Sequence, residues 1–166
     1  MNTQSLHTPL SPDFALMPDA LTHKELVIRA ERWLRNTIGC SVVLAELVTN
    51  AGEVPDAIGW KSGTSTLVEC KVSRSDFFRD AAKMGRQTGM HMGDMCYYMT
   101  PPSLVTQEEV PFYWGLIEVH GRTVKVAKRA AVRPAKTTGE LHCARTRQAR
   151  EIMILVSALR RAMEVV

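Results

Sequence analysis

Residues 53–77 read EVPDAIGWKSGTSTLVECKVSRSDF and carry the strongest structural pattern of this chain. Two strand-like segments, 53–60 and 64–72, flank a turn sequence at residues 61–63. A segment rich in Val and Leu, at residues 41–49, precedes them across a second turn. This order predicts a meander of three antiparallel strands.

Charged side chains fall on one face of the third predicted strand. Successive side chains of a strand point to opposite faces, so Glu69 and Lys71 share a face with Leu67. The other face is apolar and can pack under a helix (Val68, Cys70 and Val72). An unpaired charge buried in such a strand would cost several kcal/mol, so Glu69 and Lys71 need partners or a bound ion.

Asp56 lies on the preceding strand, and a short meander brings its carboxylate toward Glu69. Two neighbouring carboxylates repel each other unless a cation sits between them. A hard dication such as Mg²⁺ suits oxygen ligands and keeps positions open for water and phosphate oxygens. Lys71 would then be a movable positive charge that orients a water or stabilises charge on a phosphate. The alternative is a salt bridge at a strand edge.

The periodicity outside this segment completes a single α/β domain. The predicted elements are a helix over 21–36 with the Thr22 and Glu25 capping box, a helix over 75–84 capped by Ser75, a strand over 95–100, a hairpin over 114–119 and 123–127, and a helix over 142–164. Residues 1–20 contain three prolines and no periodicity and are interpreted as an irregular N-terminal arm, followed by one domain over 21–166.

The last predicted helix carries an apolar face formed by Ile152, Leu155, Leu159 and Met163. We expect this face to pack back on the sheet, with a seam between two copies in a homodimer, or a partner-docking surface, as the alternative.

Composition narrows the class of protein further. The chain has 166 residues, 45% of them hydrophobic and 23% charged, which excludes a disordered chain, a collagen-like repeat and a coiled coil. No apolar run is long enough to span a bilayer and no secretory signal is visible, so we expect a soluble, cytoplasmic protein. The four cysteines never form a close pair and are expected to be free thiols.

Charge is divided unevenly along the chain. Residues 121–166 hold 11 Lys and Arg against 3 Asp and Glu, whereas residues 1–120 carry a net charge of −4. A basic C-terminal third beside an acidic body is typical of a protein that binds a polyanion, although a solvated basic helix has the same composition.

The pattern of residues 53–77 resembles the PD-(D/E)XK nuclease superfamily. Pro55-Asp56 matches its PD element, and Glu69-Cys70-Lys71 matches its ExK element, with twelve residues between Asp56 and Glu69. The predicted order of helix, three strands, helix and strand is similar to that superfamily's core, the restriction-endonuclease-like αβββαβ fold with a central mixed sheet; the hairpin and last helix would be additions. Further runs look like a smaller branch, the MmcB-like bacterial DNA-repair proteins and related phage-encoded proteins: 72–77, 92–94, 97–99 and 114–116.

The resemblance covers residues 21–120 and implies roles for particular residues. Asp56 and Glu69 would be metal ligands, Cys70 of the ExK element is also counted among the ligands, and Lys71 would be the catalytic cation. The superfamily often adds a further acidic residue, for which the candidates are Glu25, Glu31 and Glu46. Helix capping by Glu25 and ordinary strand exposure of Glu46 are the alternatives.

Candidate phosphate contacts lie at the start of the second helix and in the basic segments: Ser73, Arg74, Lys83, Arg86, Arg145, Arg147 and Arg150. A solvated basic face is the alternative for these arginines and lysines. We interpret His23 as a packing or hydrogen-bonding residue of the helix terminus, and His91 as an incidental loop histidine.

Together these features predict a DNA nuclease that hydrolyses phosphodiester bonds with Mg²⁺ or Mn²⁺, in DNA repair or phage DNA metabolism. The alternative is a catalytically inactive module of the same fold that binds nucleic acid or a protein partner. No base-reading motif is visible, so any specificity would come from DNA shape or from a partner.

Overall fold

The computed structural model describes residues 21–46, 54–83, 85–86, 91–134 and 136–164. Within these residues six strands form one mixed sheet whose order in space follows their order in the chain. The elements are α1 (His23–Trp33), the π-helical η1 (Leu34–Ile38), β1 (Val42–Ala45), β2 (Ala57–Lys61), β3 (Thr64–Cys70), α2 (Arg74–Ala81), β4 (Met95–Thr100), β5 (Trp114–His120), β6 (Thr123–Lys128) and α4 (Thr138–Glu164). The arm expected at residues 1–20 lies outside the described residues.

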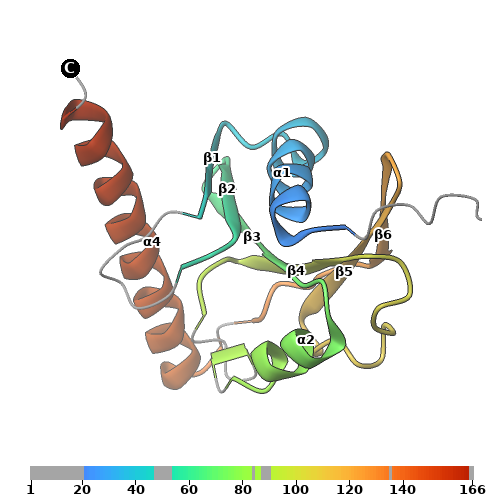
Figure 1. Ribbon diagram of the computed structural model, residues 1–166. Coiled ribbons are helices and arrows are strands. Elements are labelled where there is room, and N and C mark those ends of the chain that lie inside the picture. The colour runs from blue at the N-terminus through green and yellow to red at the C-terminus, as the bar shows by residue number, and fades with distance from the viewer. Residues whose placement is uncertain (1–20, 47–53, 84, 87–90, 135, 165–166) are drawn as a thin grey trace, which may run out of the picture.

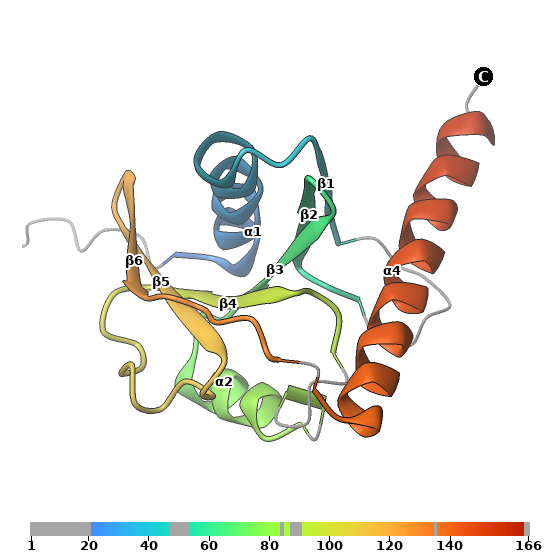
Figure 2. The same cartoon turned by 180° about the vertical axis from the view of Figure 1, so that it is seen from behind.

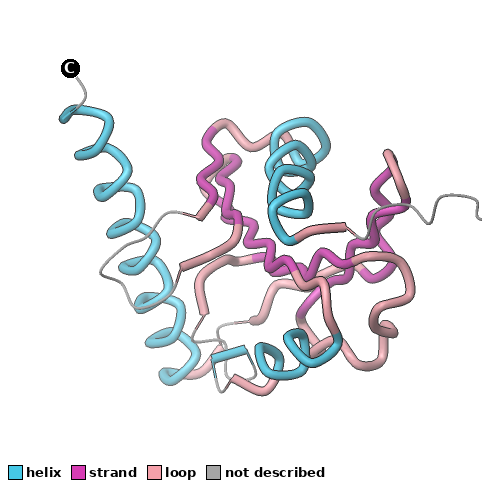
Figure 3. The backbone as a smooth tube through the Cα atoms, in the orientation of Figure 1, coloured by secondary structure: helices cyan, strands magenta, loops and turns pink. Residues whose placement is uncertain are grey.

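The sheet begins with the predicted meander. β1, β2 and β3 are antiparallel neighbours, and the turn between β2 and β3 places Ser62 and Gly63 at positive φ. β4 and β5 then run parallel to β3, and β6 returns antiparallel to β5. The hairpin β5–β6, expected as an addition to the core, therefore continues the same sheet (Figure 3). The structure confirms an α/β architecture with helices against a mixed sheet.

Helices α1 and α2 lie on opposite faces of the sheet (Figure 1). Leu26, Ala30 and Trp33 of α1 pack in one apolar cluster with the β3 residues Val68 and Cys70. Phe77 of α2 belongs to the other cluster, which includes Leu67 of β3, Tyr98 of β4 and Trp114 of β5. The predicted division of β3 into two faces is confirmed, and it places Glu69 on the α2 side because Glu69 alternates with Val68 and Cys70.

The capping residues explain where the first two helices start. Thr22 and Glu25 form the predicted capping box, in which the Glu25 carboxylate accepts from the Thr22 amide at 2.8 Å. For α2 the predicted cap is wrong: Ser73 rather than Ser75 accepts from the Asp76 amide, at 3.2 Å. Ser73 has the extended backbone that an N-cap needs, so the helix begins at Arg74.

Helix α4 does not pack as its periodicity predicts. Ile154 is fully buried, but Ile152, Leu159 and Met163 of the predicted face are 59%, 61% and 69% exposed. Figures 1 and 2 show the reason: α4 stands beside the end of the sheet near β2, and its C-terminal turns extend past the body. The helix also begins earlier than expected, at Thr138.

A buried carboxylate fastens α4 to the sheet. Glu151, 7% exposed, accepts hydrogen bonds from the Trp60 indole at 3.1 Å, from the Ser65 hydroxyl at 2.9 Å and from the Gly93 amide at 2.9 Å. Gly93 has φ +87°, and a Cβ at this position would lie 2.6 Å from the Leu67 side chain, so glycine is required for this close approach.

Replacing Glu151 with alanine is expected to lower the free energy of unfolding by about 1–3 kcal/mol. The substitution leaves the Trp60 indole, the Ser65 hydroxyl and the Gly93 amide without the carboxylate that accepts their hydrogen bonds. Urea denaturation would measure the loss, and limited proteolysis would report earlier cleavage within α4. Glu164→Ala, at the exposed end of the same helix, is the matched control and should leave both measurements unchanged. Equal stability of the two variants would contradict the fastening role of Glu151.

Candidate active site

A cavity of about 430 Å³ lies between the ends of β2 and β3 and helix α2. Acidic and basic side chains line it together: Asp56, Glu69, Asp80, Lys71, Lys83, Arg86, His91 and Arg150. Such a concentration of titratable groups in one cavity is typical of a functional site. Apolar side chains at the same positions would be buried at a lower cost in free energy.

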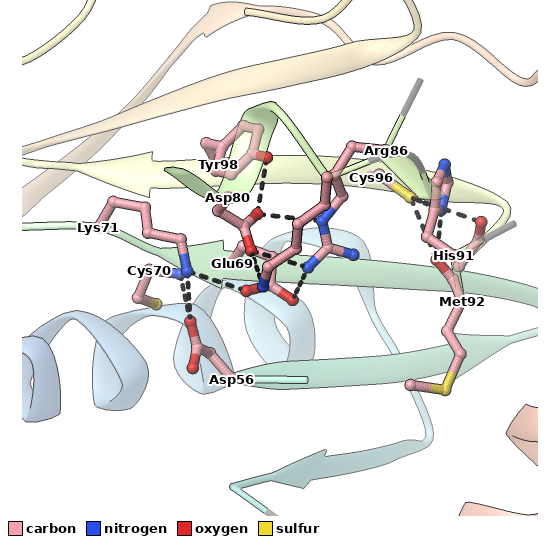
Figure 4. A network of polar contacts seen from close by, with 12 residues as sticks. Asp56, Glu69, Cys70, Lys71, Asp80, Arg86, His91, Met92, Cys96 and Tyr98 are labelled. Atoms are coloured by element: carbon pink, nitrogen blue, oxygen red, sulfur yellow. Dashed lines mark hydrogen bonds and ion pairs between the residues drawn. The ribbon is translucent and has the colours of Figure 1, made fainter. Parts of the chain in front are cut away.

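The strand register brings Asp56, Glu69 and Lys71 together. Ala57 pairs with Val68, so the next positions along the two strands, Asp56 and Glu69, face each other. The Lys71 ammonium lies 3.1 Å from a Glu69 oxygen and 3.7 Å from an Asp56 oxygen. The same Asp56 oxygen accepts from the Cys70 amide at 2.7 Å, which holds the carboxylate against β3. Figure 4 shows Lys71 between the two acids.

Helix α2 and the residues after it bring two more charged side chains to the site, Asp80 and Arg86. Arg86 donates to Glu69 at 2.9 Å and to Asp80 at 3.0 Å, and it is 3% exposed. Asp80 also accepts from the Tyr98 hydroxyl at 2.8 Å and from Lys83 at 2.6 Å. The buried arginine therefore joins the carboxylate of β3 to the carboxylate of α2 (Figure 4).

Burial and neighbouring charge perturb these groups in different directions. Burial raises the pKa of Glu69 to about 7, although Arg86 and Lys71 oppose the shift. Burial alone would lower the pKa of Lys71, but the negative charges of Glu69, Asp80 and Asp56 outweigh it and raise that pKa above its ordinary value. Burial would likewise raise the pKa of Asp80, yet hydrogen bonds from Arg86 hold it well below its usual range. Asp80 is thus a fixed anion, while Glu69 changes charge near neutral pH.

The raised pKa of Glu69 predicts a dependence of stability on pH. Between its ordinary pKa of 4.5 and about 7, the folded state binds more protons at Glu69 than the unfolded state does, so stability falls as pH rises through this window. Glu69→Gln removes the ionisation and should abolish the decline, so the stability of wild type relative to the variant should fall by up to about 3 kcal/mol between pH 5 and pH 8.

Urea denaturation of both proteins at pH 5, 6, 7 and 8 measures this difference. Glu164→Gln, an exposed acid on α4, is the control and should follow the wild-type curve. Parallel curves for wild type and Glu69→Gln would contradict the buried, proton-binding state of Glu69.

The acids expected from the first helix and first strand do not join the cavity. Glu25 is held by Thr22 in the capping box, and in the described part of the chain neither Glu31 nor Glu46 lines the cavity. Glu46 lies 3.9 Å from His23, whose other ring nitrogen is 3.2 Å from Asp56. His23 thus lies in polar contact with a carboxylate of the site.

The acid that joins the cavity is Asp80, which sequence reasoning missed. The sequence feature that could have identified Asp80 is its position three residues after Phe77, because this spacing places both side chains on the buried face of α2. His91 also differs from its interpretation as incidental. It is 7% exposed, contacts the Cys96 sulfur at 3.3 Å and packs edge-on to Trp114, so it forms part of the cavity wall.

The expected phosphate contacts separate into two groups. Arg86 is buried within the network, Arg74 forms a two-pronged pair with Glu109 at 2.6 and 3.1 Å, and Arg147 contacts Asp94 at 2.9 Å. Burial of Arg86 contradicts its assignment as a surface phosphate contact. Accessible cations remain in the set: Lys83 is largely exposed, Arg145 is exposed and Arg150 lines the cavity from α4. Ser73 serves as the helix cap.

The thiol of Cys70 does not belong to the donor set. Its side chain is fully buried on the α1 side of β3, and burial raises its pKa well above the ordinary value, so it stays a protonated thiol. The assignment of Cys70 as a metal ligand through its side chain is therefore wrong, and its main-chain carbonyl is the oxygen that it could contribute.

The remaining donors fit a hard dication. Among the described residues no group of three or more His, Cys, Asp and Glu side chains is arranged as a metal cage. Mg²⁺, however, is usually held by one or two carboxylates together with waters and substrate phosphates, which corresponds to Asp56 and Glu69. The Lys71 ammonium already lies between these two acids, so the position accepts positive charge.

Fold and site together define an α/β protein with a buried carboxylate–lysine–arginine network at the edge of a mixed sheet. In comparison with known proteins, no family model and no curated protein matches this chain. A solved structure of a protein of unknown function from Silicibacter pomeroyi is similar in fold, with a TM-score of 0.59 and 22% identity over 89% of this chain and 92% of that one. Among the described residues no helix is long and apolar enough to cross a membrane.

Proposed function

We propose that this chain is a metal-dependent DNA nuclease with a restriction-endonuclease-like core. The observation that carries the proposal is a single ammonium group, that of Lys71, in contact with Asp56 and Glu69 inside an open cavity. Two acids and a lysine converging from two adjacent strands are the elements that the PD and ExK motifs require. The basic residue Arg150 at the cavity wall favours an anionic substrate.

Each residue of the site would have a distinct role in phosphodiester hydrolysis. Asp56 and Glu69 would hold Mg²⁺ or Mn²⁺, and the ion would supply a water of lowered pKa and neutralise charge on the phosphate. Lys71 donates to the phosphate oxygen on which negative charge develops. Arg86 is a positioning residue, since it fixes Glu69 against Asp80 from within the protein. Arg150 and Lys83 would contact the DNA backbone.

A panel of labelled DNA substrates tests the proposal. Linear, nicked, flapped and four-way DNA are incubated with the protein in Mg²⁺ or Mn²⁺, with EDTA as the control. Metal-dependent product from any of the four substrates supports a nuclease, and its absence from all four contradicts it.

One observation favours a second function, a nucleic-acid-binding module without catalysis. The two Glu69 oxygens already pair with Lys71 and Arg86, so Glu69 is satisfied without a metal ion. Titration calorimetry with Mn²⁺ separates the two functions: a nuclease gives heat that Asp56→Asn removes, whereas a binding module gives no heat that depends on the carboxylates.

A further inference from the structure

A second cavity, of about 550 Å³, lies against helix α2 and shares Arg86 with the candidate active site. Three segments that are distant in the sequence form it. Phe78 and Ala81 come from α2, Glu109 and Phe112 from the segment before β5, and Arg133 from the segment after β6. Its volume is in the range of ligand pockets, roughly 300–1,000 Å³. We call this cavity the aromatic pocket.

Aromatic rings at the aromatic pocket are open to solvent. Phe112 is 82% exposed and Phe78 is 41% exposed, although each lines the cavity. Tyr113 also lines it and packs edge-on to Phe112, with ring centroids 5.0 Å apart. Because Phe112 is largely exposed despite this contact, much of its ring surface is available for stacking.

Guanidinium groups accompany these rings. The Arg133 guanidinium lies over the Tyr113 ring, 4.4 Å from its centroid, and that of Arg74 lies 5.0 Å from the centroid of Phe78. The carboxylate that lines the aromatic pocket, Glu109, is paired with Arg74 through two hydrogen bonds. Two arginines, Arg86 and Arg133, and one carboxylate line the aromatic pocket, and this lining suits an anionic ligand that carries a flat ring.

We propose that the aromatic pocket binds an unpaired base of single-stranded DNA, stacked on Phe112, with the adjoining phosphate at Arg133. Exposed aromatic rings beside cations are the features with which proteins bind single strands, because every base offers a π-face and every nucleotide a negative charge. An apolar peptide would use the rings but not the arginines. The choice of DNA as the polymer rests on the proposed function.

This pocket would determine the class of substrate. Arg86 lines both cavities, so the aromatic pocket adjoins the cavity that holds Asp56 and Glu69. A base within a continuous duplex is stacked on both sides and is unavailable for Phe112. The aromatic pocket would therefore favour DNA with a single-stranded segment, such as a flap or an overhang, over continuous duplex.

The test measures binding of the full chain to fluorescent oligonucleotides by anisotropy, in EDTA so that no cleavage occurs. The probes are a single strand of thymidines, a strand of abasic residues of the same length, and a blunt duplex. Wild type should bind the thymidine strand about tenfold more tightly than the abasic strand. Phe112→Ala should remove this difference, and Phe112→Trp should retain it. Leu159→Ala, on the exposed part of α4, is the control and should bind as wild type does.

Equal affinity of wild type and Phe112→Ala for the thymidine strand would overturn the inference, as would equal affinity of wild type for the thymidine and abasic strands. These outcomes are independent of cleavage. A Phe112-dependent preference in a protein that cuts none of the four DNA substrates would refute the nuclease and leave the aromatic pocket standing. Metal-dependent cleavage without that preference would support the nuclease and refute base binding in the aromatic pocket.

Discussion

The Lys71→Ala variant is expected to lose cleavage by about 10²–10³-fold, the usual effect of removing one donor to a charge that develops in the transition state. Lys71 is 7% exposed, and its ammonium faces Asp56 and Glu69 rather than the solvent. The loss should appear in kcat, because Arg150 and Lys83 are unchanged and would still bind the DNA backbone.

Asp56→Asn is expected to lose at least as much, because an amide is a poor ligand for a hard dication. The asparagine oxygen can still accept from the Cys70 amide, so this variant should remain folded. The measurement is cleavage of the best substrate of the DNA panel in Mn²⁺, beside anisotropy binding in EDTA. Lys61→Ala, at the far end of β2, is the control and should cut DNA at the wild-type rate. Unchanged cleavage by both site variants would show that the reaction takes place elsewhere.

Arg86→Ala is expected to destabilise the protein by about 3–5 kcal/mol, the largest effect on stability that we predict. Arg86 pairs with Glu69 and Asp80, and all three side chains are at most 5% exposed. Removing the guanidinium leaves two buried carboxylates with less compensating charge.

Lys83 provides the control for Arg86→Ala, because it is the other cation that pairs with Asp80. Lys83 also pairs with Asp80, at 2.6 Å, but its side chain is 61% exposed. Lys83→Ala should cost only about 0.2–1 kcal/mol, as exposed ion pairs do. In a double-mutant cycle, Asp80→Asn should reduce the cost of Arg86→Ala, because the two groups interact directly. Equal losses for Arg86→Ala and Lys83→Ala in urea denaturation would refute the buried network.

Local patterns predicted the part of the site that lies on neighbouring strands. Alternation along β3 identified the face that carries Glu69 and Lys71, and the short turn after Lys61 made β2 its neighbour, so Asp56 could be placed without a structure. The capping box of α1 was equally local, since Thr22 and Glu25 are three residues apart.

Residues that reach the site from elsewhere were beyond such patterns. Asp80 reaches the site because α2 packs on the face of the sheet that carries Glu69, and Arg86 reaches it by pairing with Asp80. His91 reaches it through its contacts with Cys96 and Trp114. An arginine in a polar segment looks like a surface cation until the fold brings two carboxylates to it. Arg86 was therefore interpreted as a phosphate contact.

Helix α4 shows the same division at the level of packing. Its periodicity correctly indicated a helix, but its exposed apolar stripe and its buried Glu151 reverse what amphipathicity predicts. Contacts with Trp60, Ser65 and Gly93 select the buried side, and these partners are distant in the sequence.

The amino-acid order alone thus specifies elements, turns and strand faces, because these depend on interactions between residues a few positions apart. Which charges are buried together, and which helix face is covered, depends on the three-dimensional approach of segments separated by tens of residues. For this protein the acids and lysine of the meander belong to the first kind, and the arginine-centred network and the aromatic pocket to the second.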